Sequence, residues 1–143
     1  METAAIVGTL DLCYCTTLRK AARRISQFYE EKLQPTGLRV TQFAMLRVIG
    51  ESREIAINEL ATRLELDRTT TGKNLRPLER AGLIAVKPSS TDGRSRTVAL
   101  TPEGDAILIV ATPLWNEAQQ EFERNLGGDA AALRDRLGAL GIE

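Results

Sequence analysis

The chain of 143 residues is long enough for one domain with a buried core and too short for two ordinary domains. Its 43% hydrophobic residues against only 4% aromatics indicate a mostly helical interior, and the absence of histidine argues against catalytic triads and histidine–zinc sites. The 19 basic and 19 acidic residues balance, and the longest apolar run covers six residues, far below the about 20 of a membrane span.

The first predicted element is a long amphipathic helix over about residues 9–33, where apolar residues recur at helical spacing. Pro35 and Gly37 are expected to end it. Thr41 is the expected N-cap of a second, shorter helix that runs to about Gly50. The inward side chains of this second helix are expected to be Phe43, Leu46 and Ile49.

Residues 57–81 predict two further helices, INELATRLE and RTTTGKNLRPLERA, which are separated by a turn at Leu66 and Asp67. The Asp67 side chain is expected to cap the second of these helices, where its negative charge also complements the helix dipole. Two short β-type runs follow at 83–88 and 96–100, and SSTDGRS lies between them. These two runs therefore predict a β-hairpin with residues 89–95 at its tip.

The last predicted elements are helical. Thr101 is expected to cap a helix that has Pro102 at its first position, runs to about Leu126 and is kinked by Pro113. Asp129 is expected to cap a final helix that carries three leucines. The order of elements therefore predicts a mostly α fold with a small β-hairpin, of the α+β class, built as a single domain over 1–143.

Charge is segregated along this order of elements. Residues 68–96 carry seven Lys/Arg against two Asp/Glu, whereas residues 101–143 carry three against eight. A local basic stripe of this kind is what binding to nucleic-acid phosphates requires, whatever the overall charge.

The helix that begins at Arg68 has two distinct faces. At about 100° per residue, Thr71, Leu75, Leu78 and Gly82 face the core. The opposite face carries Thr69, Lys73, Arg76 and Arg80, and Thr70 and Asn74 lie on its flank. Although a solvated charged face is the simpler interpretation, a capped helix of this kind followed by a basic hairpin is the arrangement that docks into a major groove. The DNA-binding residues expected on this helix are Arg68, Thr69, Thr70, Lys73, Asn74 and Arg76.

The hairpin is expected to act as a wing. Arg94, near the tip, is the candidate for insertion into the minor groove, and Arg96 is the candidate for a phosphate contact. The two arginines lie on the same side if the segment is extended and the turn does not rotate one of them. Asp92 is expected to pair with an arginine and to hold the wing in shape.

Over nearly the whole chain these residues resemble the MarR family of regulators. The most specific part is INELATRLELDRTTTGKNLRPLERAGLIAVKPSSTDGRSRTVALTPEG, which is similar to the family's helix-turn-helix, its D-x-R wing and its L-T-x-x-G helix entry. The D-x-R residues are Asp92 and Arg94, and the L-T-x-x-G residues are Leu100, Thr101 and Gly104. One departure is Pro77, which is expected to bend the recognition helix after Arg76 and so affects the reach of Arg80.

The resemblance implies a homodimer. Dimerisation helices at about 9–33 and 102–141 would interlock, and two winged helix-turn-helix lobes at about 41–100 would straddle double-stranded palindromic operator DNA. Members of the family usually repress transcription, and many release DNA when a small phenolic or aromatic effector binds between the dimerisation and DNA-binding parts. By this resemblance the effector pocket is lined from the first, second and fifth helices, and no cofactor and no metal are expected.

Cys13 and Cys15 are the chain's two cysteines, and their spacing suits a reducing compartment such as the cytoplasm. They are about 200° apart on a helix, which excludes a disulfide between them within one chain. Inert packing, a thiol redox switch and a metal site shared by two chains all stay open. The resemblance supports the second of these, because a minority of the family senses oxidants through a cysteine on the first helix. The alternative function is therefore a redox-sensing repressor that uses Cys13 or Cys15.

Two other classes of function compete with that of a cytoplasmic repressor. An enzyme is disfavoured, because the chain has no nucleophile elbow, no P-loop and no glycine-rich dinucleotide fingerprint. A winged-helix domain used only for protein contacts is separated from a regulator by DNA binding that weakens steeply with salt.

Overall fold

The computed structural model describes residues 9–10, 12–91 and 93–141. Asp92 therefore lies outside the described residues, as does residue 11 of the first predicted helix. The elements in chain order are α2 (Tyr14–Leu33), a 3-10 turn (Gln34–Thr36), α3 (Val40–Ser52), β1 (Glu54–Ala56), α4 (Ile57–Arg63), α5 (Arg68–Arg80), β2 (Ile84–Pro88), β3 (Arg96–Leu100), α6 (Pro102–Leu126), a second 3-10 turn (Gly127–Asp129) and α7 (Ala130–Gly138).

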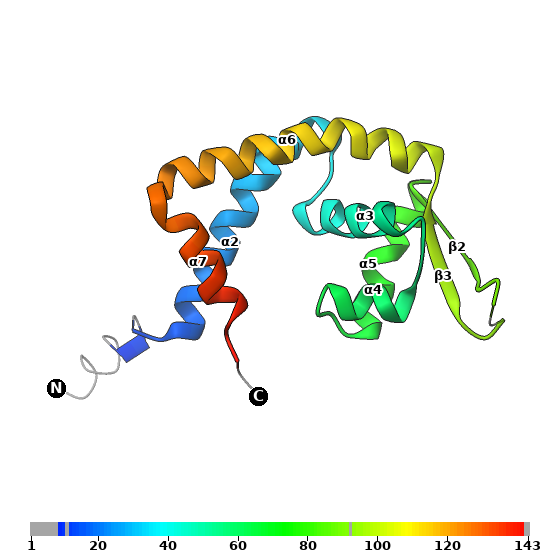
Figure 1. The fold of residues 1–143 in the computed structure, drawn as a ribbon, viewed down its shortest axis with the longest axis horizontal. Coiled ribbons are helices and arrows are strands. Elements are labelled where there is room, and N and C mark those ends of the chain that lie inside the picture. The colour runs from blue at the N-terminus through cyan, green and yellow to red at the C-terminus, as the bar shows by residue number, and fades with distance from the viewer. Residues whose placement is uncertain (1–8, 11, 92, 142–143) are drawn as a thin grey trace.

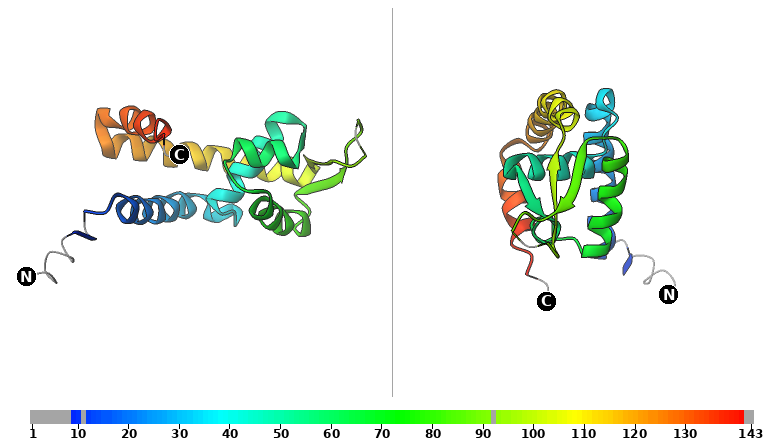
Figure 2. Two further views of the ribbon diagram at one scale, coloured as in Figure 1. Left: turned by 90° about the horizontal axis from the view of Figure 1, so that it is seen from below. Right: turned by 90° about the vertical axis from the view of Figure 1, so that its right-hand side faces the viewer.

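Helix α6 spans the molecule and connects its two ends (Figure 1). The helices α2 and α7 lie at one end, and α3, α4, α5 and the three strands form a lobe at the other end. Figure 2 shows α2 running alongside α6. The chain therefore separates a region of terminal helices from a lobe that contains the helix-turn-helix and the hairpin.

The core of the lobe is made of aliphatic side chains, as the composition predicts. Every element of the lobe contributes to it, and its members include Leu46, Ile49, Leu60, Leu75, Leu78, Ile84 and Val98. Phe43 of α3 stacks on Trp115 of α6 with their ring centroids 5.6 Å apart. This aromatic pair fixes the lobe to α6.

The three strands form one antiparallel sheet in the order β1-β3-β2. The hairpin strands β2 and β3 agree with the prediction, with Val86 opposite Val98. The strand β1 was not predicted, because three residues are too few for a period-2 pattern. It pairs with β3 through Glu54–Ala99, Ile55–Val98 and Ala56–Thr97, which makes β3 the central strand.

Two predicted helix starts are wrong. Thr9 and Leu10 are helical, but the chain is not helical at Leu12 and Cys13, so α2 begins at Tyr14 with the extended Cys13 as its N-cap. Helix α3 begins at Val40, with Arg39 as its N-cap, and the Arg39 N–H donates to the Gln42 side chain at 3.0 Å. Thr41 therefore lies inside the helix that it was expected to cap.

The expected caps of α5 and α6 are confirmed, since Asp67 and Thr101 both accept backbone hydrogen bonds. Asp129 occupies the N-cap position of α7, but its side chain makes no capping bond. Helix α6 continues through Pro113 to Leu126 as one gently curved helix (Figure 1). None of the helices within the described ranges is long and apolar enough to cross a membrane.

Candidate nucleic-acid interface

The first turn of α5 is held by Asp67. Its carboxylate accepts the Thr70 N–H at 2.6 Å and the Thr70 hydroxyl at 3.0 Å, and its carbonyl accepts the Thr71 hydroxyl at 2.8 Å. The Thr70 backbone and side-chain hydrogen bonds, in that order, hold the pKa of Asp67 below its ordinary value. The N-terminus of α5 is thus fixed by local bonds, and the Thr70 hydroxyl is already used in them.

The two faces of α5 are as the periodicity predicts. Thr71, Leu75 and Leu78 are buried. The opposite face is exposed and carries Thr69, Lys73, Arg76 and Arg80, while Thr70 and Asn74 are partly exposed beside it. Arg68 is exposed at the first position of the helix. Gly82 is not on the core face: it is exposed, and its φ of 77° ends the helix in the left-handed conformation that glycine adopts most readily.

The exposed face of α5 keeps its positive charge. Among the described residues the ion pairs are Lys32–Glu121, Arg47–Glu51 and Arg63–Glu51, and none of them involves a cation of α5. Pro77 is exposed and does not end the helix, because the Ala81 N–H still bonds to the Pro77 carbonyl at 3.0 Å. Arg80 therefore remains on the same helix as Lys73 and Arg76.

The hairpin places its two arginines differently. Arg96 begins β3 opposite Pro88, and by strand alternation it lies on the same side of the sheet as the buried Val98, which is the side packed against α5. Arg94 lies in the exposed turn, so the two arginines do not share one extended segment. The hairpin is closed by a hydrogen bond from the Ser89 N–H to the Ser95 carbonyl at 2.8 Å.

The base of the hairpin is tied to the start of α6 by Thr101. Its N–H donates to the Leu83 carbonyl at 3.1 Å, its hydroxyl donates to the Gly82 carbonyl at 2.5 Å, and the same hydroxyl accepts the Gly104 N–H at 3.1 Å. Thr101 and Gly104 thus connect hairpin and helix through the Thr101 hydroxyl and neighbouring backbone groups. These contacts give the physical reason for the threonine and the glycine of the L-T-x-x-G pattern.

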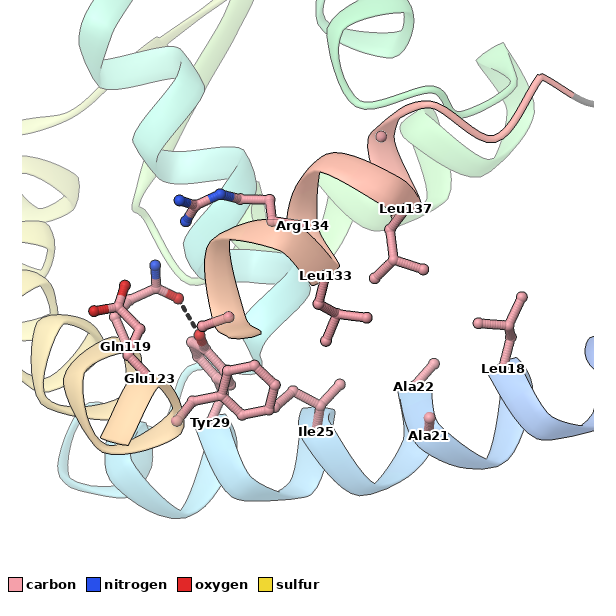
Figure 3. A pocket seen from close by; sticks show the side chains of 13 residues that line it. Leu18, Ala21, Ala22, Ile25, Tyr29, Gln119, Glu123, Leu133, Arg134 and Leu137 are labelled. Atoms are coloured by element: carbon pink, nitrogen blue, oxygen red, sulfur yellow. Dashed lines mark hydrogen bonds between the residues drawn. The ribbon is translucent and has the colours of Figure 1, made fainter. Parts of the chain in front are cut away.

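A groove with a volume of about 750 Å³ runs between α2, α6 and α7. Figure 3 shows Leu18, Ala22 and Ile25 of α2 facing Leu133 and Leu137 of α7 across it. Its polar end is formed where the Tyr29 hydroxyl donates to the Gln119 side chain (Figure 3). Burial first, and Glu123 second, raise the pKa of Tyr29.

Apolar side chains around this groove are left open. Leu12 is 77% exposed and Tyr14 is 85% exposed, and the exposed set also includes Leu10, Leu18, Leu133, Leu137 and Leu140. Phe122 lies in the wall of the groove, whereas Trp115 stacks on Phe43. The terminal helices therefore present a large unpartnered apolar face.

A second groove of about 750 Å³ lies between α3 and α6. Its lining includes Gly50, Leu108, Ile109 and Arg47. The Arg47 guanidinium donates to the Thr112 hydroxyl at 3.3 Å. The helices α3 and α6 correspond to the second and fifth predicted helices, which are two of the three that the family resemblance indicates for an effector pocket.

Both cysteines are free thiols, Cys13 partly exposed and Cys15 exposed. Because Cys13 is not helical, the angle of about 200° that argued against a disulfide does not apply to this pair. Hydrogen bonds from the Thr16 side chain first, and then from its backbone, lower the pKa of the Cys13 thiol. The described part of the chain contains no cluster of three or more Cys, Asp or Glu side chains that could hold a metal ion.

Comparisons with known proteins agree with this architecture. The model of the MarR family matches residues 36–95. An HTH-type transcriptional repressor of Mycobacterium tuberculosis is 35% identical over 106 residues, which cover 66% of this chain and 76% of that protein. The crystal structure of the M. tuberculosis transcriptional regulator MosR in complex with DNA has a TM-score of 0.82 at 38% identity and covers 90% of this chain and 92% of that one.

A mutant MarR from E. coli complexed with operator DNA has a TM-score of 0.76 at 26% identity, and the match covers 85% of this chain and 88% of that one. The residues that the family model matches include α3, α4, α5 and β2. The chain belongs to the MarR family of winged-helix transcriptional regulators.

Proposed function

We propose that the chain acts as a cytoplasmic homodimer that binds double-stranded palindromic operator DNA and represses transcription. The observation that carries this proposal is the exposed face of α5, where Thr69, Lys73 and Arg76 lie in a row without an acidic partner among the described residues. The relatives that were crystallised with DNA support it, because they share the fold around this helix.

The side chains on α5 suit the edges of bases in a major groove. Arginine and lysine pair with guanine, asparagine pairs with adenine, and the threonine methyl group contacts thymine. We therefore assign base contacts to Lys73, Asn74 and Arg76, and we assign phosphate contacts to Arg68 and Thr69. Thr70, whose hydroxyl donates to Asp67, would offer its methyl group to DNA. Arg94 would enter the minor groove and Arg96 would meet a phosphate, with Asp92 holding the wing.

The second copy in this proposal covers the groove between α2, α6 and α7. Exposure of an apolar face that contains Leu133, Leu137 and Tyr14 to water is unfavourable in free energy. In a symmetric dimer the same face of each protomer is buried against the other. Dimerisation through these helices would leave both copies of α5 free to meet DNA, because α5 does not line the groove. Two recognition helices related by two-fold symmetry read a palindromic site.

A gel-shift titration with the DNA upstream of the chain's own gene tests the proposal. A regulator shifts this fragment at lower concentration than scrambled DNA, and its affinity falls steeply between 50 and 200 mM salt, by orders of magnitude where about six to ten phosphates are contacted. Equal affinity for the operator fragment and for scrambled DNA would contradict sequence-specific repression. No shift with either DNA would leave a winged helix that serves protein contacts.

Release by a small aromatic or phenolic effector is the expected mode of control. The groove between α3 and α6 supports it, because apolar Leu108 and Ile109 lie beside the polar group of Arg47, which is paired with Glu51, a combination that suits a phenol. Phenol is a suitable probe. It should weaken the gel shift and change the fluorescence of Trp115, the chain's one tryptophan, which stacks on Phe43 near this junction.

Thiol oxidation is the second candidate for control, and the lowered pKa of Cys13 favours it. The Cys13 thiolate would attack a peroxide oxygen, so that the S–O bond forms, the O–O bond breaks, and hydroxide or an alkoxide leaves with the electron pair. Peroxide should then abolish the gel shift, and a thiol reductant should restore it. The same peroxide sensitivity in a variant that carries both Cys13→Ser and Cys15→Ser would remove the cysteines from the mechanism.

A further inference from the structure

We propose that Glu54 is a positioning residue of the wing, which acts by fixing the central strand β3 through Thr97. The Thr97 hydroxyl donates to the Glu54 carboxylate at 2.6 Å, and Thr97 is only 6% exposed. The consequence for DNA rests on the proposed function, whereas the effect on the wing does not.

The register of the sheet explains how the two side chains meet. Glu54 pairs with Ala99, and Thr97 lies two residues before Ala99 in β3, so Glu54 and Thr97 project from the same face of the sheet. The small side chain of Ala99 leaves room for the Glu54 side chain to run diagonally towards Thr97. The other acceptor near the Thr97 hydroxyl is the Lys87 carbonyl, at 3.4 Å, so the Glu54 bond is the strong one.

Towards the hairpin tip, Thr97 is the last residue of β3 that pairs with both β1 and β2. Ala56 pairs with Thr97 at the end of β1, and beyond this point β3 pairs only with β2. The next pair is Arg96 with Pro88, which has no N–H to donate. The bond to Glu54 therefore lies directly at the point where the wing leaves the supported part of the sheet.

The carboxylate of Glu54 does not act on the arginines by charge pairing. Arg96 lies on the opposite face of the sheet, and within the described ranges no ion pair involves Glu54. Thr101 anchors the base of the hairpin and Glu54 anchors its middle. Because both anchors hold the hairpin, the direction in which Arg94 and Arg96 project is fixed before the protein binds DNA. This preorganisation lowers the entropy cost of binding.

Amide hydrogen exchange of the DNA-free protein tests the positioning directly. In Thr97→Val, which keeps the shape of the side chain, the Ser89 N–H should exchange several-fold faster than in the wild type because the wing moves more. Glu54→Gln keeps an acceptor oxygen, so the Ser89 N–H should exchange as slowly as in the wild type. Glu54→Ala removes the acceptor, so the Ser89 N–H should exchange faster. Thr112→Val, which removes a threonine hydroxyl on α6, is the matched control and should leave Ser89 unchanged. Unchanged exchange in Thr97→Val would overturn the proposal.

A double-mutant cycle on DNA distinguishes positioning from general destabilisation. Thr97→Val and Glu54→Ala should each weaken operator binding between about 2-fold and about 10-fold, the range of one lost hydrogen bond. In a background that carries Arg94→Ala and Arg96→Ala, the same changes should have almost no further effect, because the groups they position are gone. Equal losses in both backgrounds, with folding verified by circular dichroism, would overturn the proposal. If the wild type shifts no DNA, the proposed function fails and the exchange experiment alone decides on Glu54.

Discussion

A Cβ atom on Gly104 would lie 2.0 Å from the carbonyl oxygen of Leu83. The first turn of α6 thus touches the backbone at the start of the hairpin, where the Leu83 carbonyl also accepts the Thr101 N–H. Glycine at this position is required by close backbone approach, and the lobe and α6 are joined at this contact.

Gly104→Ala is therefore expected to destabilise the protein, because helix and hairpin must move apart to admit the methyl group. Overpacking of this kind costs about 1 to 3 kcal/mol of unfolding free energy. Gly72→Ala is the matched control, since a Cβ at Gly72 in α5 meets nothing within 4 Å, and alanine there should stabilise the helix by up to about 1 kcal/mol. Urea titration measures both changes, and equal stability of the two variants would contradict the contact.

Changes at Arg76 and Arg94 should separate base reading from anchoring. Arg76→Ala should relax the preference among operator variants, because a lost base contact removes about 1 to 3 kcal/mol of discrimination. Arg94→Ala should weaken binding evenly and lower the salt slope by about one unit. Salt titrations on operator and scrambled DNA measure both effects. Lys20→Ala on α2, away from the lobe, serves as the control. If the alanine variants at 73, 76 and 94 all bind DNA with full affinity and selectivity, the proposed DNA-binding surface is wrong.

Asp67 should make the stability of the lobe depend on pH. Hydrogen bonds to the carboxylate hold its folded-state pKa below the unfolded value, so their stabilisation is fully present above the unfolded pKa and is lost as the pH falls through the folded pKa. Asp67→Asn keeps a capping oxygen without the charge. The difference in unfolding free energy between wild type and Asp67→Asn should therefore shrink as the pH falls from 6 to 3. A difference that stays constant over this interval would mean that the carboxylate contributes nothing as an anion.

Dimerisation through the terminal helices is tested by sedimentation. At micromolar concentration the wild type should sediment at about twice the 15.7 kDa of one chain. Leu137→Glu should shift the equilibrium towards the monomer, because it places a charge inside the apolar groove. Ala85→Glu puts the same charge on the exposed face of β2 and should leave the dimer intact. A wild type that sediments as a single 15.7 kDa species would contradict the homodimer.

The reactivity of Cys13 should depend on Thr16. In a Cys15→Ser background, Thr16→Val removes the hydroxyl whose hydrogen bond lowers the pKa of the Cys13 thiol. The pH at which alkylation by iodoacetamide is half-maximal should consequently rise. Thr17→Val is the neighbouring control. An unchanged alkylation profile in Thr16→Val would show that this hydroxyl does not stabilise the thiolate.

Much of the fold followed from local patterns in the sequence. A cap lies within a few residues of the turn that it stabilises, so Asp67 and Thr101 could be recognised from their neighbours alone. The helical repeat likewise separated the buried Leu75 and Leu78 from the exposed Lys73 and Arg76, since a face of one helix depends on spacing only. Thr41 was misassigned because the chain enters α3 through the Arg39–Gln42 bond instead of a threonine cap.

Tertiary structure alone decided the features that join distant segments. Strand β1 exists because β3 offers it a partner more than 40 residues later in the chain, and three residues carry no periodic signal of their own. The contact of Gly104 with Leu83, the bond of Thr97 to Glu54 and the groove between α2 and α7 arise in the same way. These features arise from packing between segments that are distant in the sequence. The energy of such a contact depends on how the two segments meet in the fold, and the neighbouring residues in the sequence do not determine it.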